Sequence, residues 1–178
     1  SRDSLTKITG QAPRGFRAPL YNFSHRTGRL MAEADFVYDA SLMGDDQPYL
    51  LETGAGQLVE LPSHWGLDDW PQYVQSMDLD YMMPIRAPED GWRPFVQEFE
   101  AAYTYGGLWV PVVHPFATGR LSRWIVVRKF LASVLSRGDV WFAPMEDIAT
   151  HVKRVVSDGS WTPRIDAVPF YDAPIRAK

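Results

Sequence analysis

Three polar residues in this sequence stand where their side chains could act together on a substrate. Arg17, Asp39 and His114 each come directly after a short apolar segment and directly before a turn. In parallel α/β folds the reactive side chains gather at the carboxyl ends of the strands. If the three apolar segments are strands of one sheet, we expect these side chains to lie together at the carboxyl end of that sheet.

The chemistry that these residues could support is acid–base catalysis. A partly desolvated His114 could act as a general acid near neutral pH, especially beside a carboxylate; the alternative is a histidine bonded to a backbone carbonyl. The guanidinium of Arg17 needs a carboxylate partner, either in the site or in a structural ion pair. Asp39 could instead cap the turn that follows it.

The elements that must position these residues alternate between short strands and helices. The pattern predicts strands at 15–18, 37–40, 58–61, 108–113 and 140–142, and helices at 3–8, 25–34, 93–105, 121–136 and 144–156. Strands that alternate with helices indicate a parallel α/β architecture, either doubly wound or a barrel. A closed barrel takes about 250 residues and eight strands. This chain offers four or five strands and opens inside a helix, so we expect part of a barrel.

The remaining segments have no clear period. Residues 44–56 and 63–91 are interpreted as loops, and long ordered loops on compact domains are usually functional. The pairs Asp45-Asp46 and Asp68-Asp69 are interpreted as solvated loop acids or turn caps. We expect one domain over 1–157 and an irregular tail over 158–178.

Composition narrows the class of protein. The 178 residues are 46% hydrophobic and carry a net charge of −4, which gives no general attraction to nucleic acid or to an anionic membrane. The absence of cysteine excludes disulfides and thiolate metal sites, and it fits a cytoplasmic location. No apolar run approaches the roughly 18 residues of a membrane span, and no signal peptide opens the chain.

Several motifs, taken in order, resemble those of the polysaccharide deacetylase (NodB-homology) family. Its third, fourth and fifth motifs are similar to Gly15-Phe16-Arg17-Ala18-Pro19, to Tyr38-Asp39-Ala40-Ser41 and to Val112-Val113-His114-Pro115 followed by Gly119-Arg120. The segment 60–71 resembles an insertion in the branch that contains peptidoglycan-deacetylase-like proteins, cyclic imide hydrolases and allantoinase-like enzymes. The resemblance covers about residues 1 to 157.

The resemblance implies the C-terminal part of a distorted (β/α)7 barrel with a long irregular insertion, and one bound divalent metal, usually zinc. In that family an Asp acts as general base and a His protonates the leaving nitrogen. His114 would then be the acid, Arg17 would orient the catalytic Asp, and Asp39 would tune His114. Substrate would contact Pro19, Trp65 and Pro115, although Trp65 could equally be a core residue.

The first two family motifs are absent, and they provide the base and the metal ligands. We therefore expect those groups outside this chain, on an N-terminal half that is a separate chain or a removed segment. The exposed sheet edges of an incomplete barrel predict an obligate complex or homo-oligomer. The substrate would be an N-acetylated sugar polymer, or a small linear or cyclic amide such as an imide or allantoin. The alternative from another class is a non-catalytic remnant that binds a ligand or a partner.

Overall fold

The chain folds into two compact units, each described here by itself. The computed structural model describes residues 2–173, and the first unit comprises the described parts of 1–62 and 143–178. The second unit is residues 63–142. Arg17 and Asp39 belong to the first unit, and His114 belongs to the second.

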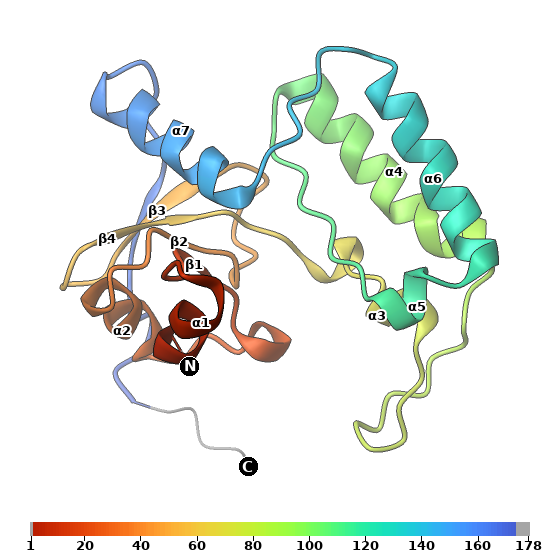
Figure 1. The fold of residues 1–178 in the computed structure, drawn as a ribbon, viewed down its shortest axis with the longest axis horizontal. Coiled ribbons are helices and arrows are strands. Elements are labelled where there is room, and N and C mark those ends of the chain that lie inside the picture. Colours follow the sequence, from red (N-terminus) through yellow and green to blue (C-terminus); the bar gives the residue numbers. More distant parts are fainter. Residues whose placement is uncertain (1, 174–178) are drawn as a thin grey trace. The chain divides into compact units, whose positions relative to one another are not determined.

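A five-stranded sheet forms the centre of the first unit (Figure 1). Its strands are β1 (Gly15–Phe16), β2 (Tyr38–Asp39), β3 (Tyr49–Glu52), β4 (Gln57–Glu60) and β5 (Ile165–Ala167), in the order β1-β2-β4-β3-β5. Every neighbouring pair is parallel except β3 and β4, which form an antiparallel hairpin. The other elements of this unit are the helices α1 (Arg2–Thr9), α2 (Thr27–Glu33) and α7 (Met145–Ser157), and the short 3-10 helix η1 (Pro19–Tyr21).

The mixed sheet corrects two predictions. Residues 44–56 are not all loop, because β3 lies within them and turns back to β4 through Thr53, whose N–H donates to the Gly56 carbonyl over 3.1 Å. Gly54 stands in this turn at φ 72°, a conformation that glycine adopts without strain. The tail beyond residue 157 is not wholly irregular either, because β5 pairs with β3.

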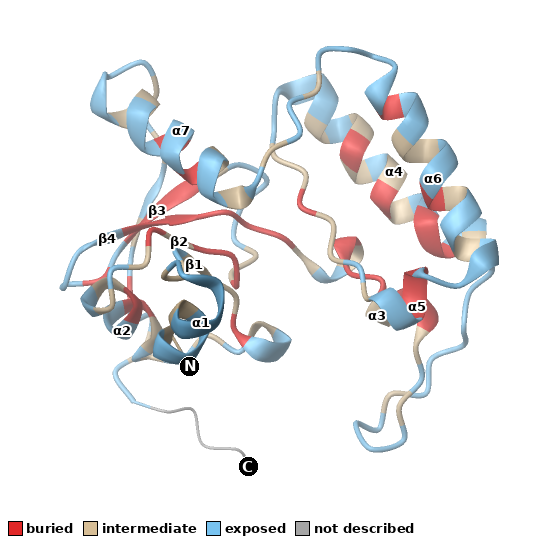
Figure 2. Cartoon of the chain, in the orientation of Figure 1, coloured by how far each residue is buried: buried red, intermediate tan, exposed pale blue. Residues whose placement is uncertain are grey.

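The core of the first unit lies against the central strands. Figure 2 shows β3 and β4 as almost continuously buried, as expected of strands that are covered on both faces. Tyr49, Leu51 and Leu58 pack there with Met31 of α2 and with Val168. The same burial encloses the carboxyl end of β4, where an acidic residue, Glu60, is fully buried.

The second unit is helical within the residues that the structure describes. Its elements are η2 (Trp65–Leu67), α3 (Trp70–Tyr73), α4 (Pro88–Tyr105), α5 (Pro115–Thr118) and α6 (Leu121–Leu135). Helices α4 and α6 lie side by side and enclose a core that contains Trp92, Phe95 and Val127 (Figure 1). No helix in the described residues has the length and apolar character of a membrane span.

The predicted strands at 108–113 and 140–142 are wrong. Residues 108–113 run as extended chain, and Val112 makes one isolated parallel bridge, to Asp68. Trp109 packs against the α4–α6 core instead, and its indole N–H donates to the Phe95 carbonyl. An apolar segment can thus be buried by side-chain packing without joining a ladder. Residues 140–142 are neither helix nor strand.

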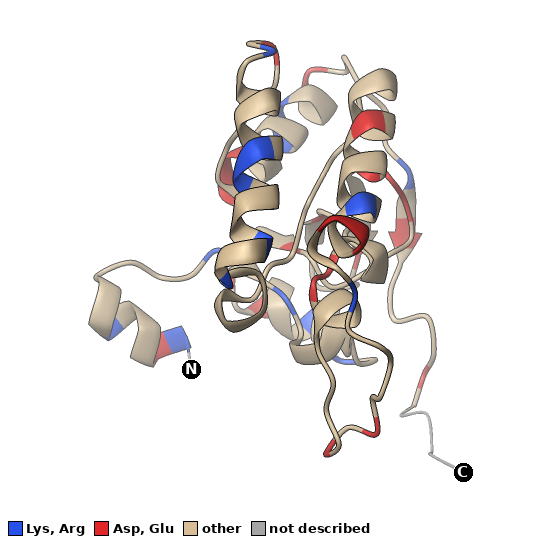
Figure 3. Cartoon of the chain, turned by 90° about the vertical axis from the view of Figure 1, so that its right-hand side faces the viewer, with Lys and Arg blue, Asp and Glu red and all other residues tan. Residues whose placement is uncertain are grey.

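Helix α4 ends where the sequence analysis predicted, but it begins at Pro88, five residues before the predicted start at residue 93 and within the segment interpreted as loop. Pro88 occupies the first helical turn, followed by Glu89 and Asp90 at the positive end of the helix dipole. The helix ends at Gly106, which has φ 68°. Figure 3 shows charged positions spread over this unit, and Arg137, just after α6, pairs with Glu100 of α4.

Candidate active site

His114 and Asp69, which are 45 residues apart, meet in the second unit. Asp69 stands directly before α3, and His114 stands directly before α5. Backbone bonds hold the two segments together, since the Val112 N–H donates to the Leu67 carbonyl over 2.7 Å and the Asp69 N–H donates to the Val112 carbonyl over 3.1 Å. The side chains are therefore positioned by backbone pairing as well as by their own contact.

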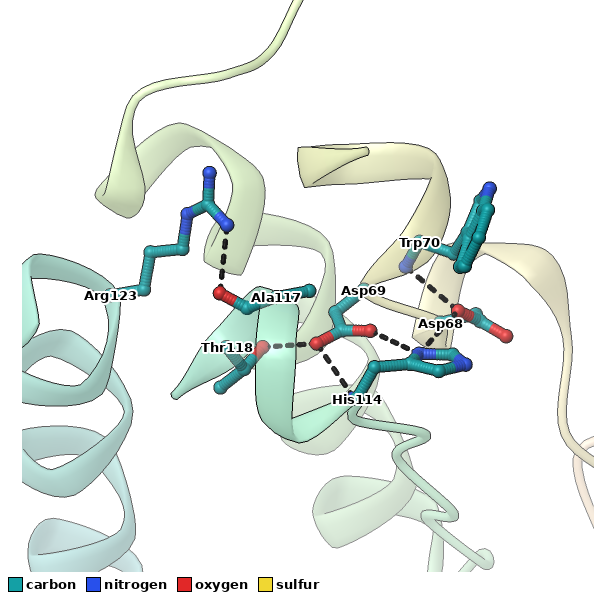
Figure 4. A network of polar contacts seen from close by, with 7 residues as sticks. All are labelled: Asp68, Asp69, Trp70, His114, Ala117, Thr118 and Arg123. Atoms are coloured by element: carbon teal, nitrogen blue, oxygen red, sulfur yellow. Dashed lines mark hydrogen bonds and ion pairs between the residues drawn. The ribbon is translucent and has the colours of Figure 1, made fainter. Parts of the chain in front are cut away.

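The Asp69 carboxylate binds His114 at two points (Figure 4). Its Oδ1 lies 2.6 Å from the His114 Nδ1, and its Oδ2 accepts the His114 backbone N–H over 2.9 Å. Oδ2 also accepts the hydroxyl of Thr118. An ionised carboxylate can only accept, so the His114 Nδ1 carries the proton of the 2.6 Å contact. That choice of tautomer leaves Nε2, on the other side of the ring, as the atom able to take up and donate a proton.

Burial separates the roles of the two partners. Asp69 is 0% exposed, whereas the His114 side chain retains 33% of its accessible surface. A buried carboxylate with three hydrogen bonds is held in one orientation. The imidazole is thereby fixed on its inner side and accessible on its outer side, as a group that exchanges protons with a substrate must be.

Asp68 adds a second buried carboxylate to the site. Its Oδ1 accepts the Trp70 backbone N–H over 2.8 Å and lies 3.8 Å from the His114 Nδ1. Asp68 is 3% exposed and Asp69 is 0% exposed, so the solvated-acid interpretation of this pair is wrong, whereas the turn-cap alternative is confirmed for Asp68 by its bond to the Trp70 N–H. Within the second unit the acid that contacts His114 is Asp69, and the expectation that Asp39 tunes His114 stays a prediction.

Two aromatic rings flank His114. The ring centroid of His114 lies 5.6 Å from that of Trp70 and 5.7 Å from that of Phe116, and the rings of Trp70 and Phe116 are themselves 5.6 Å apart. Phe116 is 59% exposed. The imidazole therefore stands beside an accessible apolar surface of the kind on which a flat or sugar-like ligand can rest.

Arg17 and Asp39 occupy the carboxyl ends of neighbouring parallel strands, as predicted. The Arg17 Nε donates to the Ala40 carbonyl over 2.8 Å. Asp39 is fully buried and accepts the backbone N–H of Ser41 over 2.9 Å and its hydroxyl over 2.8 Å. The turn-capping alternative for Asp39 is thus confirmed. The Arg17 Nη2 is buried and has no hydrogen-bond partner within residues 2–173.

Glu60 joins this group and was missed by the sequence analysis. Burial, followed by the negative charge of Asp39, raises the pKa of Glu60 to about 10, and burial also raises the pKa of Asp39. Oε1 of Glu60 accepts the Leu42 N–H over 2.9 Å, while Oε2 is buried and faces no donor among the described residues. Burial and the charge of Asp39 therefore favour the protonated form of Glu60, and a side-chain hydrogen bond links Glu60 to Asp39. The signal that could have revealed Glu60 is the presence of an acidic residue within the apolar segment 58–61, which was predicted to be a strand.

The three residues expected to contact substrate all lie at the surface. Trp65 is 45% exposed in η2, so the core-packing alternative for it is wrong. Pro115 opens α5 directly after His114 and is exposed. Pro19 opens η1 in the first unit, two residues after Arg17, and is also exposed. A residue must be accessible in order to contact substrate, and these three residues are accessible. Their contacts with substrate remain predictions.

Asp68, Asp69 and His114 offer three ligand atoms within 4.8 Å of one another, the spacing of a cation site. Their bonding does not fit one, because each residue already takes part in a hydrogen bond: Asp69 with the His114 Nδ1 and the Thr118 hydroxyl, and Asp68 with the Trp70 N–H. A metal ion would have to displace donors that a buried carboxylate needs. The network is therefore arranged to orient His114 rather than to hold a metal.

Two known proteins that this chain resembles are named as deacetylases. A crystal structure assigned to the polysaccharide deacetylases, from Mycobacterium smegmatis, is 39% identical with a TM-score of 0.82, and the match covers 96% of this chain and 58% of that one. The peptidoglycan deacetylase of Helicobacter pylori is 24% identical in an alignment 175 positions long, which covers 84% of this chain and 60% of that protein. No family model matches the chain.

The fold is shared more widely. A Puue allantoinase structure is 23% identical with a TM-score of 0.72, and the match covers 90% of this chain and 52% of that one. The α/β class is thereby confirmed. The chain spans between about half and three fifths of the length of each of these three proteins.

Proposed function

Because this chain belongs to the polysaccharide deacetylase family, we propose that it supplies the general-acid side of a hydrolase of non-peptide C–N bonds. The observation that carries the proposal is the 2.6 Å contact between the His114 Nδ1 and the buried Asp69 carboxylate. That contact fixes the imidazole with Nε2 on its accessible side, where a proton can pass to the leaving nitrogen.

Each residue has a separate task in this proposal. Asp69 holds the ring and stabilises its charged form, and His114 delivers the proton from Nε2 as the C–N bond breaks. The free Nη2 of Arg17 is suited to bind and orient the carboxylate of a general base. Asp39 keeps the Arg17 segment in place indirectly, because it binds Ser41, whose Oγ accepts the Ala18 N–H over 2.8 Å.

The base and the metal would come from outside the described residues. The network around Asp69 does not fit a metal, and the sequence has no counterpart of the two family motifs that contain those groups. When bound, a divalent ion such as zinc would supply polarisation of the substrate carbonyl. This division predicts that the chain acts together with the remainder of a barrel, either as part of one polypeptide or as a subunit of an obligate complex or homo-oligomer.

An N-acetylated sugar polymer is the favoured substrate. The 39% identity is with a protein assigned to the polysaccharide deacetylases, whereas the allantoinase similarity, at 23% identity, is one of fold alone. The exposed ring of Phe116 beside His114 gives a sugar ring a surface to rest on. A small linear or cyclic amide is the alternative substrate.

The test is to purify the protein together with everything that remains attached to this chain. Mass spectrometry and metal analysis should find a segment that carries an Asp and two His, with one metal ion per site. Acetate release from an N-acetylated glucosamine oligomer then measures activity, and His114→Ala should abolish most of it. A preparation of this chain alone without metal or hydrolysis would indicate a non-catalytic binding protein, and near-normal turnover in His114→Ala would exclude the acid role.

A further inference from the structure

The Asp69 carboxylate has a third partner, Thr118, which lies at the end of α5 and is 3% exposed. We propose that Thr118 is a positioning residue: its hydroxyl fixes the rotation of the Asp69 carboxylate, so that Oδ1 faces the His114 Nδ1. This inference rests on the proposed acid role of His114 and adds a residue that acts on His114 only through Asp69.

The hydroxyl of Thr118 uses its bond to Asp69 in place of the usual helical one. A threonine in a helix commonly donates to the carbonyl four residues earlier, which here belongs to His114. That carbonyl accepts the backbone N–H groups of Ala117 and Thr118, each over 2.9 Å, while the Thr118 hydroxyl donates to the Asp69 Oδ2. Since Thr118 and Asp69 are both buried, water cannot easily replace this bond.

The short helix α5 therefore joins His114 and Asp69 from both of its ends. Directly before the helix, the backbone N–H of His114 donates to the Asp69 Oδ2, and at its end the Thr118 hydroxyl donates to the same oxygen. Two donors on Oδ2 leave Oδ1 for the imidazole. Without the hydroxyl, the His114 backbone N–H is the donor that remains on Oδ2. The carboxylate is then held less firmly and can rotate more freely.

Helix α6 anchors the far end of this arrangement. The Arg123 Nη1 donates to the Ala117 carbonyl over 2.7 Å (Figure 4). The Arg123 guanidinium also lies 4.3 Å from the centre of the Tyr73 ring of α3. Thr118 thus sits on a turn that is held independently of Asp69. Because this turn is held independently, the Thr118 hydroxyl can set the orientation of the Asp69 carboxylate, which packing alone would not do.

The test is NMR on the protein purified with everything that remains attached to this chain, and it needs no hydrolysis. In the parent, the nitrogen chemical shifts of the neutral His114 ring should show the Nδ1–H tautomer, and the Nδ1 proton should exchange slowly with water. Thr118→Val keeps the shape and removes the hydroxyl, so the Nε2–H tautomer should appear and Nδ1–H exchange should become about tenfold faster. Thr118→Ser should restore the parent behaviour.

A matched control is Thr104→Val, which removes a hydroxyl that donates to the Glu100 carbonyl on the exposed face of α4. It should leave the His114 signals unchanged. Thr118→Ala serves the same purpose as Thr118→Val if the valine variant does not fold. An Nδ1–H tautomer that is as dominant and as slow to exchange without the hydroxyl as in the parent would overturn the proposal.

The same variants separate this inference from the proposed function. In the metal-loaded protein, Thr118→Val should lower kcat about tenfold with little change in KM, and Thr118→Ser should recover most of the loss. If the NMR signature responds as expected but no variant or parent hydrolyses amides, the positioning role stands and the proposed activity fails. If hydrolysis requires His114 but is indifferent to the Thr118 hydroxyl, only the positioning role fails.

Discussion

The substitution Glu60→Gln should remove a pH dependence from the stability of the first unit. Glu60 is fully buried and its pKa is raised to about 10, first by burial and then by the charge of Asp39. An unfolded chain releases this proton near pH 4.5, so folding takes up a proton across the whole interval between the two pKa values. The contribution of Glu60 to stability is complete below that interval and declines as the pH rises through it.

The change of the free energy of unfolding with pH follows from the proton that is taken up on folding. One proton taken up on folding lowers the free energy of unfolding by about 1.4 kcal/mol for each unit of rising pH. Between pH 6 and pH 8 the parent should lose about 3 kcal/mol from this group. A glutamine at position 60 can still accept the Leu42 N–H and donate to Asp39, but it binds no proton, so this part of the slope should vanish.

The assay is urea unfolding of parent and variant at pH 6, 7 and 8. The free energy of the Glu60→Gln variant minus that of the parent should rise by about 3 kcal/mol over this range, because all other titrations cancel in the difference. The matched control is Glu52→Gln, an exposed position on β3, for which the difference should stay constant. A difference for Glu60→Gln that does not change with pH would refute the buried, protonated state of Glu60.

Two further predictions concern stability. Ser41→Ala removes the acceptor of the Ala18 N–H and a donor to Asp39, both buried, and should cost about 1–3 kcal/mol in urea unfolding; an unchanged midpoint would contradict this. Gly91→Ala would place a methyl group 2.3 Å from a ring carbon of Tyr73, whose hydroxyl donates to the Pro88 carbonyl over 2.6 Å, and it should destabilise by about 1–3 kcal/mol. The cost should shrink in a Tyr73→Leu background, and equal costs in both backgrounds would show that the ring is not the obstacle.

The sequence predicted best those features that depend on local signals. Helix α4 ends at the glycine that predicted its end, although its start at Pro88 was placed five residues too late, and α6 lies within a residue of its predicted bounds. Arg17 and Asp39 were placed correctly at strand ends because each follows an apolar pair and precedes a turn. Strand β4 was predicted, but its hairpin partner β3 was missed although the turn between them contains two glycines, because residues 44–56 were interpreted as one loop.

The partner of His114 could not be predicted because the contact is non-local. Asp69 lies in a proline-containing segment without a clear period, and only the backbone pairing between residues 67–69 and Val112 brings it to His114. Local pattern alone cannot distinguish such an acid from a solvated one. The segment 108–113 was likewise interpreted as a strand because six successive residues suit one, whereas tertiary packing of Trp109 determines its course.

The central claim is that Asp69 holds His114 as a general acid, and Asp69→Asn tests it most directly. The asparagine amide can donate to Nδ1, which would move the ring proton to Nε2 and remove the charge that stabilises the imidazolium. In the metal-loaded protein, kcat for amide hydrolysis should fall by at least about 100-fold with KM nearly unchanged. The control Asp45→Asn, which loses an ion pair with Arg164 at the surface of the first unit, should keep its activity. A kcat for Asp69→Asn within about twofold of the parent would contradict the account.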